Sequence, residues 1–139
     1  MYREFELKKS EIDTVAKAIL ELLPHGGILL LKGDLASGKT TLVRHIAAVL
    51  GIKKEAVSSP TFSVMNAYRS DFFHYDIYQK GFNGILENGL FEHLQQAGYH
   101  FIEWADEELE AMLKRYALPY AIVEISVVPN KRVYKVYNA

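Results

Sequence analysis

The chain has 139 residues, of which 50% are hydrophobic and 24% are charged, and its formal net charge at pH 7 is -1. This length and composition predict one folded domain over residues 1–139, and the small net charge gives no general argument for binding nucleic acid or an anionic membrane. The absence of cysteine excludes disulfide bonds and thiol chemistry, and with no leader or membrane-spanning pattern it predicts a cytoplasmic protein.

The first predicted elements surround a glycine-rich segment. Apolar residues at helical spacing predict a helix that begins at an N-cap, Ser10, and ends before Pro24. Aliphatic residues 27–31 predict a buried strand, and apolar residues on one side of 39–50 predict a second helix with Gly51 as its C-cap. The glycine-rich segment therefore lies between a strand and a helix.

A hairpin is predicted next along the chain. Aromatic and β-branched residues favour strands at 62–68 and 72–78, and the short connection between them makes the pair antiparallel. Residues 86–97 have a helical pattern that Gly89 interrupts, and residues 99–104 form a short apolar strand.

The remaining elements complete the predicted fold. A helix is expected at 106–116, followed by a hairpin with strands 120–128 and 132–137 around a turn that begins at Pro129. The alternation of strands and helices predicts a three-layer α/β fold with a mixed parallel and antiparallel central sheet, as in P-loop NTPases.

Residues 33–40 read Gly-Asp-Leu-Ala-Ser-Gly-Lys-Thr, a complete G-x-x-x-x-G-K-[ST] phosphate-binding loop. The two glycines let successive backbone N–H groups face a phosphate, Lys39 reaches the outer phosphates, and the Thr40 hydroxyl group can bind Mg²⁺. The helix that begins at the lysine adds its positive N-terminal dipole. The sequence therefore predicts a site for a nucleoside triphosphate with Mg²⁺, the alternative being a glycine-rich turn without a ligand.

Two glutamates compete for the role of second magnesium ligand, which is expected at the end of a strand beside the loop. Glu103 follows two apolar residues and stands where its strand ends, as ligands in α/β proteins do. Glu124 has apolar neighbours on both sides, as expected in the middle of a strand. The pattern favours Glu103, the alternative being a strand-end carboxylate paired with a lysine.

Polar residues alternate with apolar ones at 74–78. In a strand, His74, Asp76 and Tyr78 share one face, predicted to be polar, while the other face belongs to the core. Asp76 is a candidate to orient the attacking water, the alternative being a half-exposed strand in which Asp76 and His74 bond to each other. His74 is interpreted as an orienting residue, because no second histidine stands at metal-ligand spacing.

A polar loop is predicted between the second helix and the hairpin. It contains Ser59-Pro60-Thr61, which could reach the γ-phosphate or could form a plain turn before a strand. Residue patterns alone leave these two interpretations open.

The motifs described above closely resemble, in order and spacing, those of the bacterial TsaE (YjeE) family. They are the phosphate loop with Thr41, Ser59-Pro60-Thr61, His74-x-Asp76-x-Tyr78 and Ile102-Glu103-Trp104. Residues 86–90, a helix segment broken by a glycine, also resemble the family, so the resemblance covers most of residues 27–104.

The resemblance implies a small Mg²⁺-dependent ATPase that is required for the threonylcarbamoyl modification of adenosine 37 in tRNA. Such a protein binds the TsaD–TsaB pair, and its ATP hydrolysis resets the complex between turnovers. Contact with tRNA is expected through this complex, and no membrane partner is expected.

The resemblance also implies roles for individual residues. Lys39, Asp76 and Glu103 are expected to be catalytic, and Thr40 and Glu103 are expected to bind Mg²⁺. Trp104 would lie beside the site, and Thr61 would sense the γ-phosphate. The expected nucleotide-binding residues are Asp34, Leu35, Ala36, Ser37, Gly38, Lys39, Thr40, Thr41 and Thr61.

One position departs from the family. Members often have an arginine after the His-x-Asp-x-Tyr run, whereas this chain has Gln79 and then Lys80. An arginine that stabilises charge is therefore not expected at this place.

Two other functional classes share the phosphate loop. A GTPase needs an Asn-Lys-x-Asp sequence to read guanine, but Asn130-Lys131-Arg132-Val133 lacks the aspartate. A small kinase that phosphorylates a nucleoside or metabolite needs an arginine-bearing lid, and the five arginines form no such cluster in the sequence. The kinase is the alternative to the ATPase.

Overall fold

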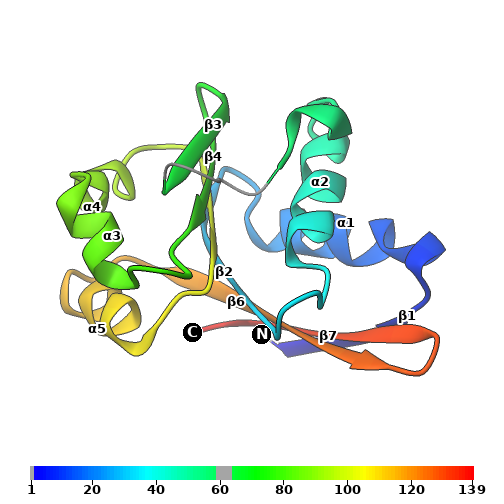
Figure 1. Cartoon of the computed structure of the whole chain (residues 1–139). Helices are drawn as coiled ribbons and strands as arrows, with labels where there is room; N and C mark the ends of the chain where they lie inside the picture. Colours follow the sequence, from blue (N-terminus) through cyan, green and yellow to red (C-terminus); the bar gives the residue numbers. More distant parts are fainter. Residues whose placement is uncertain (1, 59–63) are drawn as a thin grey trace.

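The computed structural model describes residues 2–58 and 64–139, and its strands form one seven-stranded sheet (Figure 1). The strands are β1 (Tyr2–Leu7), β2 (Gly27–Lys32), β3 (Met65–Arg69), β4 (Phe72–Asp76), β5 (Tyr99–Glu103), β6 (Tyr120–Val128) and β7 (Lys131–Asn138). They lie in the order β1-β7-β6-β2-β5-β4-β3. The four strands from β6 to β4 run parallel to one another, and the outer strands run antiparallel to their neighbours. The predicted mixed sheet is confirmed.

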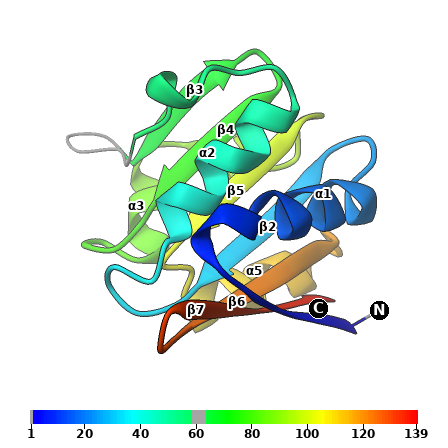
Figure 2. The same ribbon diagram turned by 90° about the vertical axis from the view of Figure 1, so that its right-hand side faces the viewer.

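Helices cover both faces of this sheet. They are α1 (Asp13–Leu22), α2 (Lys39–Val49), α3 (Phe82–Glu87), α4 (Leu90–His93) and α5 (Glu107–Arg115), with short 3-10 turns at Lys9–Glu11 and Lys54–Ala56. Helices α1 and α2 lie on one face and α3, α4 and α5 on the other (Figure 1), and the rotated view places α1 and α2 in front of the strands (Figure 2). The predicted three-layer α/β fold is therefore confirmed.

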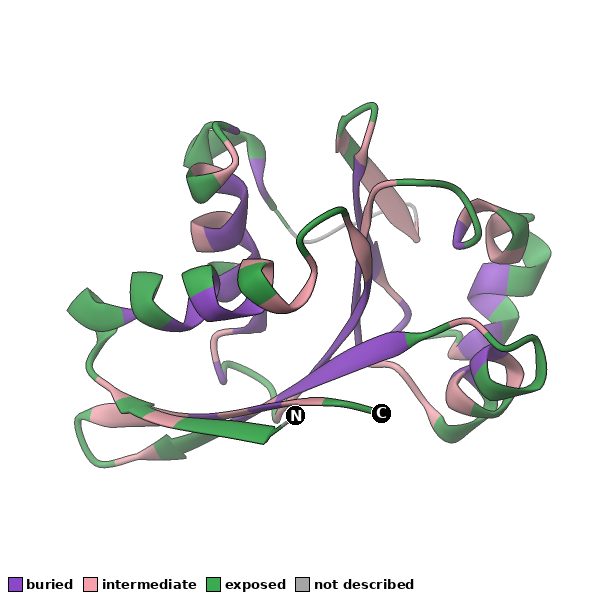
Figure 3. Cartoon of the chain, turned by 180° about the vertical axis from the view of Figure 1, so that it is seen from behind, coloured by how far each residue is buried: buried purple, intermediate pink, exposed green. Residues whose placement is uncertain are grey.

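The core has two halves, one on each face of the sheet. Strand β2 serves both halves: Leu29 and Leu31 pack toward α1 and α2, whereas Ile28 and Leu30 pack toward α3 and α5. These four residues are buried, which explains why the strand is a continuous aliphatic run instead of an alternating one. The central strands are accordingly buried in Figure 3, while the outward faces of the helices are exposed.

The N-terminal segment differs from the prediction in two ways. Ser10 does not cap α1: it lies inside the 3-10 turn, where the Glu11 carboxylate accepts a hydrogen bond from the main-chain N–H of Lys8 at 2.9 Å. Strand β1 was not predicted at all. It is a largely exposed edge strand rich in charged residues, so its sequence carries little of the hydrophobic signal that marks a strand.

The segment around Gly89 is helical, as predicted, but its bounds differ. The chain breaks at Gly89, where a φ of 66° ends α3 and starts α4. Helix α3 begins earlier than expected, at Phe82, and α4 ends earlier, at His93. Within residues 2–58 and 64–139, no helix is long and apolar enough to cross a membrane.

Candidate functional site

Three parallel strands end side by side at one edge of the sheet, and each end carries a predicted site residue. Strand β2 leads into the phosphate loop, and its Leu31 lies opposite Glu103 at the end of β5. Glu103 in turn lies opposite Asp76, the last residue of β4. Parallel pairing therefore brings the loop and both carboxylates together at the carboxyl ends of the strands, where ligands of α/β proteins bind.

The phosphate loop curls as its glycines predict. Gly38 has a φ of 103°, and a Cβ atom at Gly33 would lie 2.5 Å from the Ser37 Oγ atom and 2.9 Å from the carbonyl oxygen of Ile125. No larger residue fits at position 33 without moving the main chain of β6. Ala36 also has a positive φ, 61°, so the loop turns sharply twice within three residues.

Lys39 lies inside this loop and is only 5% exposed. Its Nζ atom donates to the carbonyl oxygens of Gly33 and Asp34, at 2.7 Å and 3.0 Å, and lies 3.8 Å from the centre of the Trp104 ring. Burial lowers the pKa of Lys39, while the negative charges of Glu103, Asp76 and Asp34 oppose that shift. The lysine is thus a desolvated cation, and such a group attracts a phosphate more strongly than a solvated one.

A chain of hydrogen bonds, buried at Glu103 and His74, extends from Thr40 to Tyr68. The Thr40 hydroxyl group donates to Oε2 of Glu103 at 2.8 Å, and Nε2 of His74 lies 2.6 Å from the same oxygen. Nδ1 of His74 lies 2.7 Å from the Tyr68 hydroxyl group, which also contacts the main chain of Ser58. The side chains of Thr40 and Glu103, predicted to lie in one site, are therefore in contact, and His74 contacts the same carboxylate oxygen.

This chain of contacts corrects the prediction of a polar face on β4, and it also contradicts the alternative of a half-exposed strand in which Asp76 and His74 bond to each other. His74 is fully buried, and its carboxylate partner is Glu103 rather than Asp76. Strand β4 is covered on both faces, because Phe72 packs into the half of the core on the α1–α2 side and Phe73 and Tyr75 pack into the other half. Tyr78 lies beyond the end of the strand and is 60% exposed.

Asp76 occupies a different environment from Glu103. Its Oδ1 atom accepts a hydrogen bond from the main-chain N–H of Tyr78 at 3.0 Å. Burial raises the pKa of Asp76, and the nearby Glu103 raises it further, while the Tyr78 hydrogen bond, His74 and Lys39 act in the opposite direction. A carboxylate with a raised pKa is a better proton acceptor than an ordinary aspartate.

A cavity of about 320 Å³ joins these groups. Its walls are the tip of the loop, the start of α2, Asp76, Glu103 and Trp104. The donor set fits Mg²⁺, since Thr40 and Glu103 offer the hard oxygen atoms that this ion prefers. Among the described residues, no three or more histidine, cysteine or acidic side chains are grouped so that they could hold a metal ion by themselves.

Other predicted residues lie elsewhere. Glu124 lies in the middle of β6, opposite Lys32 and Lys135, and its carboxylate accepts a hydrogen bond from Tyr137, so it is a residue of the sheet. Thr61 lies outside the described residues. Lys80, near the place of the family's arginine, forms an exposed ion pair with Glu87 at 3.0 Å.

Two residues of this region were missed by the sequence reasoning. Arg132, at the start of β7, donates from Nε to the main-chain carbonyl oxygen of Ser37 at 3.3 Å and so ties the C-terminal hairpin to the phosphate loop. Tyr68 completes the contacts around His74. A signal for Tyr68 was available, because a hairpin with a tight turn places Tyr68 close to His74, whereas Arg132 is distant from the loop in sequence.

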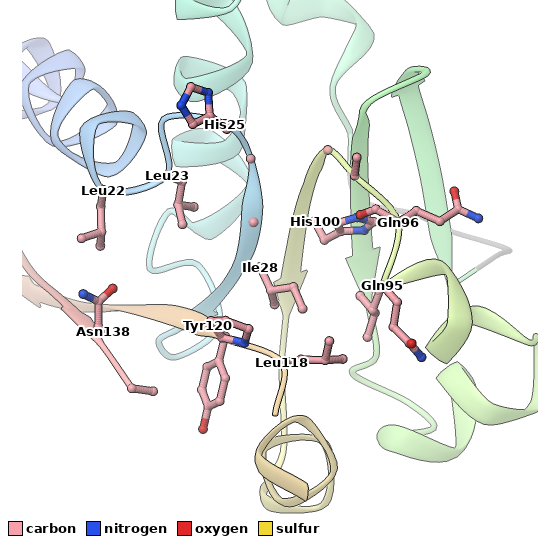
Figure 4. A pocket seen from close by; sticks show the side chains of 17 residues that line it. Leu22, Leu23, His25, Ile28, Gln95, Gln96, His100, Leu118, Tyr120 and Asn138 are labelled. Carbon is pink, nitrogen blue, oxygen red and sulfur yellow. The ribbon is translucent and has the colours of Figure 1, made fainter. Parts of the chain in front are cut away.

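A second cavity, of about 450 Å³, lies at the opposite edge of the sheet (Figure 4). Apolar side chains such as Leu22, Leu118 and Tyr120 line much of it, and it has no acidic, lysine or arginine side chain among its described lining residues. Its buried His100 is already bonded, to the Tyr75 hydroxyl group at 2.7 Å and the Gln96 carbonyl oxygen at 2.9 Å. The groups suited to phosphate chemistry are in the smaller cavity.

By its fold, the chain is a member of the P-loop NTPase-like α/β class. A solved structure of similar fold, Bacillus subtilis YdiB, has a TM-score of 0.59 and 22% sequence identity, and the match covers 98% of this chain and 86% of that one. The family model described as "Threonylcarbamoyl adenosine biosynthesis protein TsaE" matches residues 7–133. The chain therefore belongs to the TsaE family.

Similar proteins in several bacteria carry the same description. The chain is 31% identical over 137 residues to the tRNA threonylcarbamoyladenosine biosynthesis protein TsaE of Aquifex aeolicus, covering 94% of this chain and 92% of that protein. It is 32% identical over 116 residues to the protein of that name from Bacillus subtilis, covering 76% and 72%. The resemblance seen in the motifs thus extends over nearly the whole chain.

Proposed function

We propose that this protein is an Mg²⁺-dependent ATPase that acts with TsaD and TsaB in the threonylcarbamoyl modification of adenosine 37 in tRNA. One observation carries the proposal: the Thr40 hydroxyl group meets the Glu103 carboxylate at 2.8 Å beside a buried Lys39. This arrangement supplies two oxygen ligands for a cation and a positive charge for phosphate. Membership of the TsaE family supports the role in tRNA modification. We place this role in the cytoplasm.

The residues divide the work by position. Lys39 and the N–H groups of residues 34–41 hold the phosphates, and Thr40 and Glu103 hold Mg²⁺. When bound, Mg²⁺ neutralises charge that develops on the phosphate oxygens. Asp76 accepts a hydrogen bond from the attacking water and orients it, a task for which its raised pKa is suited. Thr61 is proposed to contact the γ-phosphate.

The arginines near the phosphate loop suggest why partner proteins are needed. Arg132 already bonds to the Ser37 carbonyl oxygen of the loop, and Arg44 bonds to the carbonyl oxygen of Val57. Neither is placed in the cavity that contains Lys39 and Glu103. We infer that turnover by the protein alone is slow, and that TsaD and TsaB accelerate it, while hydrolysis resets their complex and tRNA is contacted through that complex.

A comparison of ATP hydrolysis with and without the TsaD–TsaB pair tests this function. Phosphate release should depend on Mg²⁺ and should rise when the pair is added, and tRNA modification by the reconstituted proteins should require ATP. The alternative function, a small P-loop kinase, predicts a different product. Phosphate release unaffected by the pair, together with transfer of phosphate to a nucleoside or metabolite, would replace the ATPase assignment with the kinase.

A further inference from the structure

We propose that His74 and Tyr68 are positioning residues for Glu103, and that their hydrogen bonds select the carboxylate oxygen that faces Mg²⁺. The inference rests on the proposed function, because it takes Glu103 as a ligand of the metal. It assigns a task to the buried His74 and the partly buried Tyr68, which the hydrolysis chemistry itself does not use.

The two oxygens of Glu103 have different surroundings. Thr40 Oγ1 and His74 Nε2 both bond to Oε2, at 2.8 Å and 2.6 Å. Among residues 2–58 and 64–139, no hydrogen bond is made to Oε1. With Oε2 held by two donors, Oε1 is the oxygen that can turn toward a cation in the cavity. Without the His74 contact, the carboxylate could rotate and exchange its two oxygens.

Burial makes this arrangement rigid. The His74 side chain has no exposed surface, and that of Glu103 is 4% exposed, so water cannot replace a lost partner easily. The other ring nitrogen, Nδ1, lies 2.7 Å from the Tyr68 hydroxyl group. Partners on the far nitrogen fix the orientation of a histidine ring in metal sites, even where the histidine does not touch the metal.

Tyr68 is itself held by main-chain atoms. Its hydroxyl group lies 2.5 Å from the carbonyl oxygen of Ser58 and accepts from the Ser58 N–H at 3.2 Å. The ring packs against Phe72 and His74, with ring centres 6.0 Å and 5.8 Å apart. Replacing Tyr68 with phenylalanine would keep this packing and would remove only the hydroxyl group that fixes the imidazole.

The chain contains a matched control on the other face of the sheet. Tyr75 is buried, and its hydroxyl group, like that of Tyr68, lies 2.7 Å from a histidine Nδ1 atom, that of His100. The other ring nitrogen of His100 contacts the Gln96 carbonyl oxygen, so this pair does not lead to Glu103. Tyr75→Phe thus removes an equivalent hydroxyl group without touching the proposed chain of contacts.

Trp104 provides a readout that does not depend on activity. It is the one tryptophan in the sequence, and its ring lies 3.8 Å from Lys39 Nζ in the cavity. Its fluorescence can follow the binding of ADP in EDTA, and then of Mg²⁺ to the ADP complex. Urea denaturation of each variant shows whether it is folded.

We expect Tyr68→Phe to raise the Mg²⁺ concentration that half-saturates the ADP complex about 5-fold, and to leave ADP affinity in EDTA unchanged. His74→Ala should raise that concentration about 10- to 100-fold, the range typical of residues that orient metal ligands. His74→Gln, whose side-chain amide can still donate to Glu103, should recover part of this loss. Tyr75→Phe should behave as the unaltered protein.

The outcomes separate the two proposals. If Mg²⁺ has no effect on the ADP complex of the unaltered protein, the metal site itself fails and both proposals fall. If Mg²⁺ acts there but Tyr68→Phe shifts its binding no more than Tyr75→Phe does, the positioning role alone is wrong. An equal loss of ADP affinity with and without Mg²⁺ in folded His74→Ala would also overturn it.

Discussion

Lys39 is the residue on which the proposed phosphate binding depends most. Its ammonium group is buried in the loop and already donates two hydrogen bonds, which hold it where outer phosphates would lie. Charge-assisted hydrogen bonds contribute about 1.5–3 kcal/mol each, so Lys39→Ala should weaken ATP binding about 10- to 100-fold and abolish turnover. Calorimetric titration with ATP checks this, with Lys17→Ala on the exposed surface of α1 as control. Turnover at the unaltered rate would refute the site.

The charged form of Asp76 lowers the stability of the folded protein. Burial raises its pKa above that of the unfolded chain, so the carboxylate destabilises the folded state at neutral pH, where it is charged in both states. As the pH falls, Asp76 takes up a proton first in the folded protein, at its raised pKa, and then in the unfolded chain, at the ordinary value. Below both values the loss of stability caused by the buried charge is gone.

The substitution Asp76→Asn should therefore separate stability from catalysis. We expect it to raise the urea midpoint at pH 7, by an amount that shrinks as the pH is lowered toward the ordinary aspartate pKa, and to abolish ATP hydrolysis with little loss of ATP affinity. The amide oxygen can still accept from Tyr78 N–H. A lower urea midpoint together with retained hydrolysis would contradict both roles.

At the scale of elements, Asp106 joins two helices. Its Oδ1 atom accepts from Leu109 N–H at 2.9 Å and caps α5, while Oδ2 accepts from Phe82 N–H at 3.0 Å at the start of α3. Loss of an N-cap costs about 1 kcal/mol, so Asp106→Ala should lower the free energy of unfolding by about 2 kcal/mol in urea denaturation. Asp106→Asn keeps one acceptor and should lose about half. Equal stability of all three proteins would show that neither hydrogen bond contributes to the free energy of unfolding.

The elements that were predicted correctly carry strong local signals. Gly89 breaks the helix because its φ of 66° suits glycine, and the aliphatic run of β2 marks a strand buried on both faces. The start of α3 was missed because Gly81 and Gly84 lower the helical signal there. In the structure Gly84 is buried in the helix, where a Cβ atom would lie 3.3 Å from Val64, so tertiary packing requires the small residue.

At the scale of the whole molecule, the sequence indicates the candidate site residues better than it indicates the side chains that contact them. The phosphate loop and Glu103 could be found because each has a local pattern that follows from its chemistry. The contact between His74 and Glu103 joins residues 29 positions apart and depends on the parallel register of β4 and β5. Arg132 reaches the loop across 95 positions through the C-terminal hairpin. Such contacts are products of topology, which no local pattern encodes.

Because the site joins the ends of three strands and the start of α2, its ligand should stabilise the entire fold. A ligand at about 100 times its Kd adds about 2.7 kcal/mol to the free energy of unfolding. For a chain of this length, ADP with Mg²⁺ at that level should raise the Tm by about 10 °C.

The rise in Tm should become smaller when a group that binds the ligand is removed. ADP in EDTA should give a smaller rise, since Thr40 and Glu103 then have no cation to bind, and Lys39→Ala should show at most about half of the rise of the unaltered protein at the same ADP concentration. Differential scanning fluorimetry over a range of ADP concentrations measures these values. If ADP raised the Tm of Lys39→Ala as much as that of the unaltered protein, the binding of ADP would not depend on Lys39. ADP would then bind away from the phosphate loop.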